Sequence, residues 1–519
     1  DVHQHLAGIS LNYYQKQQVS AGLGTEAFIL PGRFEGIKGN GQFSLNTKVA
    51  SFSGTASYLQ ATADSIKSNF LRSSTKLSVP FWYLEGGLRQ KLEINKFKFN
   101  DGSLNNNAYK FFVYEAYVKN KKLDKIEAEL TASYRTDHTA YQAQMARQKE
   151  RRGISLSGTL NQNSNSTWRL VVNYREVRIL NDSLVNADVP DQHVSARVEN
   201  RSVLFDGILR SNTFYEVSTG LESKKEYSYL EVEPGQGNYV WIDRNDNGTK
   251  ELNEFEVAQI AAEGNHIRMY IPTDEYISVY ANQFKQTLTL NFRQWTVSKN
   301  QWLKTLSRFS DQFSYTVNQK VTDDHFANYA NPFGHQTGDS VLISTSQSLR
   351  NMLSFNKTNP KFGTDLIMNS TTNKSLLTNG FEGRQLKTME LQTRWNITQY
   401  LSLLNSGAIS DKSKTAQYFT GNNYTIRGYK AEATLRLQPK VTYRFELKYT
   451  FDEKQNTQGI ETATHHDGGV VFQYAAAQKN SINASVHYID VKFKGSGNNS
   501  LTYELLNGLQ RGGNYTWEV

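Results

Sequence analysis

One loop of the chain has the residue types and the spacing of a calcium site. Residues 243–254 match the pattern D-x-[DN]-x-[DN]-G-x5-E at every fixed position. Calcium takes about six to eight oxygen ligands, and Gly248 permits the sharp turn that gathers them. Thr249 would offer its carbonyl, and Glu251 would bind directly or through water. The predicted ligands are Asp243, Asn245, Asn247, Thr249, Glu251 and Glu254. A polar turn without a metal is the alternative.

The residues on either side of this loop do not resemble a helix–loop–helix unit. Residues 238–242 have the composition of a strand, and only residues 252–262 look helical. We therefore expect a single calcium loop inserted between strands, in which Ca²⁺ has a structural role and does not act as a sensor.

Other residues that could support chemistry give weaker patterns. His465, His466 and Asp467 could ligate a metal, but their polar setting favours a solvated loop. The glycines of residues 36–41 precede no helix and so do not predict a phosphate loop. The sequence has no G-x-S-x-G, H-E-x-x-H or P-loop motif. These patterns predict that the chain is not an enzyme and has no catalytic residues, with Ca²⁺ as its cofactor.

The segments that would position such a loop read as long amphipathic strands. Between Tyr429 and Phe451, apolar and polar residues alternate over two runs of about ten residues around a turn predicted at Pro439 and Lys440. One face carries aromatic and aliphatic side chains, and the other mixes Lys, Arg and Glu. Aromatic residues near the ends of the apolar face are typical of a transmembrane β-barrel. The strands of a soluble sandwich are usually shorter.

The same alternation recurs along the chain, in residues 154–174, 284–293, 389–395 and 482–488, and less regularly in residues 41–60 and 108–134. A short turn is predicted at residues 478–480. Longer polar loops are predicted at residues 320–339, 405–423 and 452–468. At ~10 residues per strand plus loops, we expect roughly 18 to 22 strands.

The composition agrees with amphipathic strands that have one apolar face and one polar, water-facing face. The chain has 519 residues, 12% aromatic and 21% charged residues, and no cysteine. Cysteine-free chains are common among proteins that cross an oxidising periplasm. Lys and Arg give a net charge of +9 but are spread along the chain, which indicates a wet surface and no nucleic-acid partner. No apolar run is long enough for a membrane helix.

The last residues start a strand at Tyr515 and Trp517 that stops within half a membrane thickness. From this pattern we expect the sequence to be a fragment of a longer chain with an incomplete C-terminus.

Residues 235–243, 253–256 and 271–276 resemble a motif of large, mostly uncharacterised outer-membrane proteins of Bacteroidota. The close likeness covers roughly residues 214–295. It implies an outer-membrane barrel of the surface or secretion-complex type and supplies no catalytic residue.

The predicted fold class is therefore all-β, a large antiparallel transmembrane β-barrel in the bacterial outer membrane. Its predicted parts are barrel strands in residues 1–225, an inserted loop with the calcium motif in residues 226–275, and barrel strands in residues 276–519. Transport, secretion or a structural role in a surface complex would follow, with outer-membrane lipid and other proteins as partners. The alternatives are a TonB-dependent nutrient transporter and a secreted soluble β-rich binding or adhesion protein.

Overall fold

A computed structural model gives the fold of the chain. It describes residues 5–16, 18–63, 66–121, 125–141, 143–163, 165–181, 191–243, 246–258, 261–333, 341–377, 380–417, 423–476, 480–495 and 500–518. The chain forms two compact units, residues 1–200 with 216–221 and residues 201–215 with 222–519. The division predicted at residues 226 and 275 stays a prediction.

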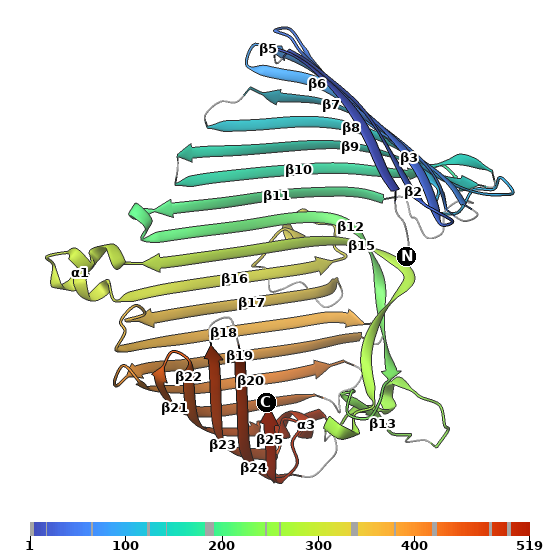
Figure 1. The fold of residues 1–519 in the computed structure, drawn as a ribbon. Coiled ribbons are helices and arrows are strands. Elements are labelled where there is room, and N and C mark those ends of the chain that lie inside the picture. The colour runs from blue at the N-terminus through green and yellow to red at the C-terminus, as the bar shows by residue number, and fades with distance from the viewer. Residues whose placement is uncertain are drawn as a thin grey trace. The chain divides into compact units, whose positions relative to one another are not determined.

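The first unit is a run of antiparallel strands (Figure 1). From β1 to β10, each strand pairs with its neighbour in the sequence. The strands are β1 (His5–Gln15), β2 (Val19–Leu30), β3 (Phe34–Asn46), β4 (Ser51–Ala63), β5 (Ile66–Phe81), β6 (Leu84–Phe99), β7 (Tyr109–Asn120), β8 (Ile126–Tyr141), β9 (Gln144–Asn163), β10 (Ser166–Ile179) and β11 (Asp191–Leu204).

The second unit repeats this arrangement and adds short helices in its connections. β12 (Leu209–Glu231) contributes residues to both units. From β15 to β25 each strand again pairs antiparallel with the next. The strands are β13 (Tyr239–Trp241), β14 (Phe255–Val257), β15 (His266–Asn291), β16 (Phe309–Val321), β17 (Leu342–Phe355), β18 (Phe362–Leu377), β19 (Gly380–Asn396), β20 (Leu401–Ala416), β21 (Tyr424–Lys440), β22 (Tyr443–Asn456), β23 (Thr462–Ala476), β24 (Asn480–Lys494) and β25 (Gly512–Glu518). The helices are η2 (Phe205–Gly207), η3 (Leu252–Glu254), η4 (Ala261–Glu263), η5 (Arg293–Val297), α1 (Gln301–Leu306), α2 (Phe326–Tyr329) and α3 (Ser500–Leu506).

The structure confirms the predicted fold class of an all-β chain built on a large antiparallel sheet. Apart from the two three-residue strands, its described part has 23 strands, more than the expected 18 to 22. The connections between strands are shorter than the estimate assumed, for example where residues 405–416 lie within β20. No helix in the described ranges is long and apolar enough to cross a membrane.

Three predicted connections are corrected by the strand boundaries. Residues 405–416 belong to β20, and the predicted loop of residues 452–468 shrinks to residues 457–461 between β22 and β23. The turn after β21 lies at Val441 and Thr442, two residues beyond Pro439 and Lys440, and Val441 is 92% exposed. Polar residues in these stretches lie on the water-facing side of a strand. Such a strand resembles a loop in the sequence when its opposite face has few large side chains. The loop predicted at residues 320–339 is confirmed for residues 322–333, which include the short helix α2, whereas residues 320 and 321 belong to β16. Residues 334–339 and the turn residues 478 and 479 lie outside the described residues.

One face of the sheet in the second unit is an apolar band that is open to its surroundings. Leu447, Val470 and Val486 lie opposite one another on β22, β23 and β24 and are 60%, 55% and 59% exposed. Aromatic pairs bound this row, Tyr443 with Tyr474 at 5.2 Å and Tyr488 with Tyr515 at 5.1 Å between ring centroids. The six residue steps from Tyr443 to Tyr449 span about 20 Å, close to the apolar band of about 25 Å in outer-membrane barrels.

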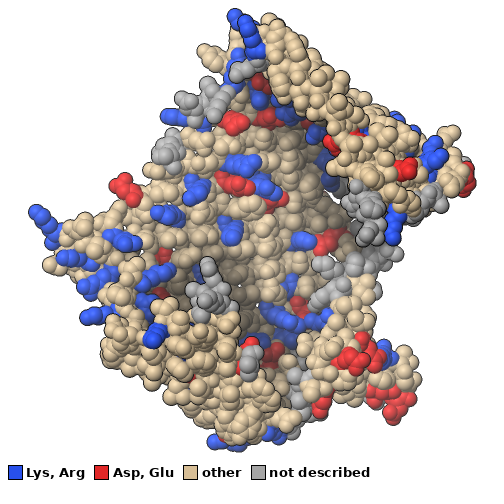
Figure 2. All heavy atoms as spheres, viewed as in Figure 1, with Lys and Arg blue, Asp and Glu red and all other residues tan. Residues whose placement is uncertain are grey.

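Ion pairs join neighbouring strands within each unit, and in the second unit they lie on the face opposite the apolar band. In the first unit Arg89 on β6 lies 3.7 Å from Glu115 on β7 and 2.9 Å from Glu129 on β8. In the second unit Arg436 on β21 lies 2.7 Å from Glu446 on β22. Figure 2 shows acidic and basic side chains next to one another among the strands. Pairing of this kind suits a wet surface, where isolated charges would repel one another and paired ones add modest stability.

The connection between β24 and β25 folds back onto this polar face. Leu501 and Leu505 of α3 pack on Tyr424, Ile426 and Ala463, which form the buried core cluster of the second unit. The sheet side chains Tyr424 and Ile426 lie on the same face of β21 as Glu432 and Arg436, because strand residues two apart share a face. The helix therefore covers part of the polar surface instead of extending away from it.

Candidate functional site

The predicted calcium loop lies at the tip of a small hairpin between β12 and β15. β13 and β14 pair with Tyr239 opposite Val257 and Trp241 opposite Phe255, and Tyr239 also pairs with His266. Aromatic rings pack against this hairpin, with Tyr229 stacked on Phe255 at 4.0 Å and the edge of one ring toward the other in Phe255 and His266 at 5.0 Å. This aromatic cluster gives the insertion a core of its own.

A close backbone approach fixes the start of the hairpin. A Cβ atom added to Gly237 would lie 2.4 Å from the backbone nitrogen of His266, so only glycine fits there. On the other side, Lys250 donates a hydrogen bond to Glu231 at 2.7 Å and its Nζ lies 5.6 Å from the centre of the Trp241 ring. The loop is therefore tied at both ends to the strands that carry it.

The first half of the loop curls around the Asp243 carboxylate. The backbone N–H groups of Asn247 and Gly248 donate to its two oxygens at 3.2 and 2.8 Å. Gly248 has φ 67°, the left-handed conformation that the motif's glycine was expected to supply. The N–H of Thr249 donates to the side-chain oxygen of Asn247 at 2.6 Å. Asn245 lies outside the described residues.

The last predicted ligand, Glu254, faces the hairpin core. Its Oε2 accepts a hydrogen bond from Trp241 Nε1 at 2.9 Å and another from the N–H of Glu251 at 3.4 Å, and the residue is 1% exposed. Asn247 Nδ2 donates to Glu251 at 3.2 Å. The structure thus brings four of the predicted ligands together in the curled part of the loop: Asp243, Asn247, Thr249 and Glu251. The carboxylate of Glu254 is instead held by its hydrogen bond from Trp241. Binding of Ca²⁺ stays a prediction.

The flanks of the loop are only partly as predicted. The expected strand at residues 238–242 is confirmed as β13. The expected helix at residues 252–262 is wrong, since the single turn η3 leads directly into β14. A capping box between Glu251 and Glu254 imitates a helix start in the sequence, but pairing with β13 takes over at Phe255.

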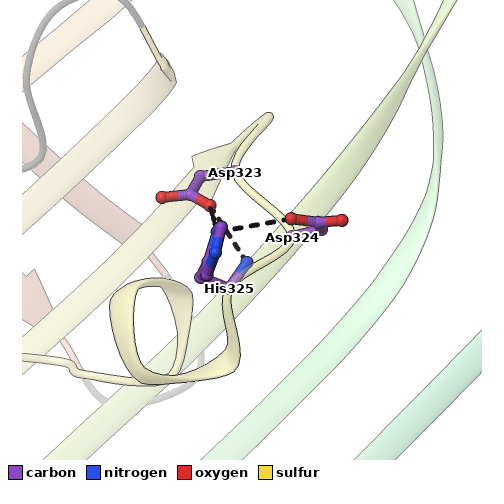
Figure 3. Close-up of side chains that lie close together, drawn as sticks. All are labelled: Asp323, Asp324 and His325. Carbon is purple, nitrogen blue, oxygen red and sulfur yellow. Dashed lines mark hydrogen bonds and ion pairs between the residues drawn. The ribbon is translucent and has the colours of Figure 1, made fainter.

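A second polar cluster, not predicted from the sequence, lies in the loop between β16 and β17 (Figure 3). Nδ1 of His325 lies 2.8 Å from Asp323 and 3.4 Å from Asp324. Hydrogen bonds from the N–H of His325 and from Asn328 lower the pKa of Asp323 to about 2, and the bond to Asp323 raises the pKa of His325. Among the described residues, this is the one group of three or more His, Asp or Glu residues whose ligand atoms all lie within 4.8 Å of one another. The hydrogen bonds from His325 and Asn328 to Asp323 hold the chain at the start of α2, so the cluster is accounted for by the local fold without a metal.

The histidines predicted to lie in a solvated loop are instead part of β23. Nε2 of His465 donates to the carbonyl oxygen of Leu505 in α3 at 2.8 Å, and His465 is buried. His466 lies on the other face against Phe451, with ring centroids 5.4 Å apart. Because strand neighbours point to opposite faces, the pair cannot converge on one ion from adjacent positions.

The hairpin also reaches the polar face of the sheet. Arg268, two residues into β15, donates from both terminal nitrogens to Glu382 of β19, at 2.8 and 3.0 Å. The Arg268 guanidinium lies 5.8 Å from the centre of the Tyr239 ring. This two-pronged ion pair, with both side chains largely buried, anchors the insertion over the second unit's strands.

No protein-family model matches the sequence, and no curated protein matches it. Among solved structures, the chain is similar to the siderophore receptor PirA from Pseudomonas aeruginosa at 10% identity and a TM-score of 0.34, over 87% of this chain and 73% of that chain. It is similar to the copper transporter OprC at 8% identity and a TM-score of 0.34, over 100% and 79%. It is also similar to the FrpB iron transporter from Neisseria meningitidis at 8% identity and a TM-score of 0.31, over 94% and 77%. At these TM-scores the likeness carries no weight for what this chain binds or moves.

Proposed function

We propose that the chain is a β-barrel protein of the bacterial outer membrane that transports polar solutes. The observation that carries this proposal is the two-faced sheet, apolar and exposed on one side and lined with paired charges on the other. Large contiguous apolar surfaces are rare on proteins in water and mark contact with a partner or with lipid. Lipid would cover the apolar face, while the polar face would line water.

The exposure of the apolar face disfavours a secreted soluble β-protein. In a sandwich, a second layer would bury the row of Leu447, Val470 and Val486, whereas each of these side chains is more than half exposed. The aromatic pairs at both ends of the row favour a membrane interface, where amphipathic rings prefer to lie.

Two segments that cover the polar face favour selective transport over an open pore. Leu505 of α3 is buried against β21 and β23, and Arg268 holds the hairpin insertion to β19. Both segments would narrow the path along the polar face. A TonB-dependent nutrient transporter is therefore the alternative that we retain within this class, and we propose transport rather than an enzymatic role.

Ion flux through the purified protein in liposomes tests this proposal. We expect a low flux for the wild-type protein and a higher flux for Leu505→Ala, which loosens α3. Leu306→Ala, at a residue of α1 that is 38% exposed, is the control and should leave the flux unchanged. Absence of flux in all three proteins, once they have entered the liposomes, would contradict the proposal.

We also propose that the loop of residues 243–254 binds one structural Ca²⁺. Support comes from the complete motif and from the curl of the chain around Asp243. Asp243, Asn247, Thr249 and Glu251 would hold the ion, with Asn245 and, after rotation away from Trp241, Glu254 completing the set. Calorimetry with CaCl₂ after chelation should show binding at one site, which Asp243→Ala abolishes. Binding that persists in Asp243→Ala would contradict this proposal, as would the absence of binding in the wild-type protein.

We further propose that the chain binds other proteins in a membrane complex. The hairpin and the loop before α2 offer folded surfaces outside the strands for such contacts. Extraction in mild detergent followed by affinity purification should recover stable partners. Recovery of the chain alone would contradict a role in a complex without affecting transport.

A further inference from the structure

A pocket on the polar face of the second unit has the size of a small-molecule site. It has a volume of about 590 Å³ and lies where the hairpin insertion covers strands β16 to β19. Tyr239 and Arg268 form the wall on the hairpin side, and Lys320, Glu382 and Arg384 line the sheet side. Sites for small ligands commonly have volumes of roughly 300–1,000 Å³.

Positive charge is in excess at one end of this pocket. Glu382 accepts hydrogen bonds from Arg268 at 2.8 and 3.0 Å and from Arg384 at 3.0 Å, so two guanidinium groups share one carboxylate. Lys414 lies opposite Arg384 in the strand register and is 7% exposed. Arg268, Arg384 and Lys414 surround Glu382. Glu504 also lies near Lys414 but is paired with Lys412, so these four cations and two carboxylates leave two positive charges in excess. Lys320 at the other end is paired with Glu222.

Uncharged hydrogen-bonding groups fill the space between the charged ones. They come from successive strands on the same face, since each lies opposite the next in register. These residues are Asn318, Ser344, Ser346, Asn373 and Ser375. Hydroxyl and amide groups can donate to the oxygens of an anion while the guanidinium groups supply the charge.

Accessibility distinguishes the two guanidinium groups. The Arg384 side chain is 54% exposed, whereas that of Arg268 is 11% exposed. Arg268 therefore positions Glu382 and the hairpin, and Arg384 is the cation that a solute in the pocket would meet.

We propose that this pocket binds a small soluble polyanion that carries phosphate or carboxylate groups. A planar guanidinium recognises either group through two parallel hydrogen bonds. At least two anionic groups would match the two positive charges in excess. The proposal deepens the transport function and rests on it in treating the polar face as water-lined.

The chain supplies a matched control for testing this site. Lys387 lies three residues after Arg384 on β19, so its side chain points to the opposite face. It is exposed and is not among the residues that line the pocket. Arg384→Gln and Lys387→Gln each remove one positive charge from the same strand, but only the first removes it from the pocket.

Calorimetry on the full chain in detergent, with inorganic pyrophosphate and citrate titrated separately, tests the proposal. We expect the wild-type protein to bind at least one of the probes. Arg384→Gln should weaken that binding by roughly tenfold or more, as for loss of a charge-assisted hydrogen bond. Arg384→Lys should retain part of the affinity, and Lys387→Gln should bind as the wild type does. The tighter probe identifies the preferred anionic group.

Two results would overturn the anion site. One is no binding of either probe to the wild-type protein, and the other is equal weakening by Arg384→Gln and Lys387→Gln, which indicates diffuse charge attraction. Because calorimetry needs no membrane, loss of probe binding with liposome flux intact contradicts the anion site alone. Probe binding without flux contradicts the transport function alone.

Discussion

Substitution by arginine should have different effects on the two faces of the sheet, as Leu447 and Ser406 illustrate. Leu447 lies in the middle of the exposed apolar row. Ser406 of β20 lies opposite Glu432 on the polar face, and both line a cavity there. An arginine at position 406 can extend toward the Glu432 carboxylate, whereas one at position 447 has only apolar surroundings.

Leu447→Arg should destabilise the protein in a bilayer by ~2–4 kcal/mol, the cost of a cation near the membrane midplane. Ser406→Arg should change stability by less than about 1 kcal/mol, as expected for a paired surface charge. Urea unfolding in lipid vesicles measures both changes. Equal costs for the two variants would argue against lipid on the apolar face.

Because of individual ion pairs, the sequence alone cannot predict which charged residues of the polar face can be replaced without loss of stability. Alternation predicts that Glu446 faces water, which suggests that its replacement is harmless. In the structure Glu446 lies 2.7 Å from Arg436 and 3.4 Å from Arg444. The alternation gives the face of a residue, but its partner on the next strand follows only from the strand register.

The elements that cover the polar face depend on a few buried contacts. Leu505 of α3 is fully buried, and its carbonyl oxygen accepts the hydrogen bond from His465. Lys454 of β22 donates to the carbonyl oxygen of Glu504 at 3.0 Å. These contacts fix a helix of only seven residues, which would not be stable by itself.

Leu505→Ala should therefore detach α3 without unfolding the sheet. Removal of a buried leucine side chain costs ~2–5 kcal/mol, which exceeds what a helix of two turns can offset. Hydrogen exchange measured by mass spectrometry should show faster exchange in α3 and unchanged exchange in β20 to β23. Faster exchange throughout those strands would instead mean that α3 belongs to one cooperative unit with the sheet.

At the scale of elements, the strands with one clearly apolar face could be predicted and the others could not. The hairpin of β21 and β22 was evident because apolar and charged residues alternate without a break. β20 was missed in residues 405–416 because its outward positions include Asn405, Gly407 and Asp411. The position of His465 was missed because its partner Leu505 lies 40 residues away. The spacing of residues 243–254 was enough to predict a tight polar loop, but the hydrogen bond between Trp241 and Glu254 depends on how the hairpin folds.

At the scale of the whole molecule, we expect the apolar face to contact lipid and the polar face to contact water. The chain has no cysteine, so single cysteines can be placed without altering the background. The strand from Tyr443 to Phe451 is suited to this test, because its described residues pair on both sides and alternate between the two faces.

Labelling of single cysteines along β22 by a water-soluble maleimide, with the protein in lipid vesicles permeable to the reagent, tests which face meets water. We expect labelling with a period of two. Positions 444, 446 and 448 should react, and positions 445, 447 and 449 should be protected until detergent and denaturant are added. Uniform labelling of all six positions, or protection of the charged positions in place of the apolar ones, would contradict it.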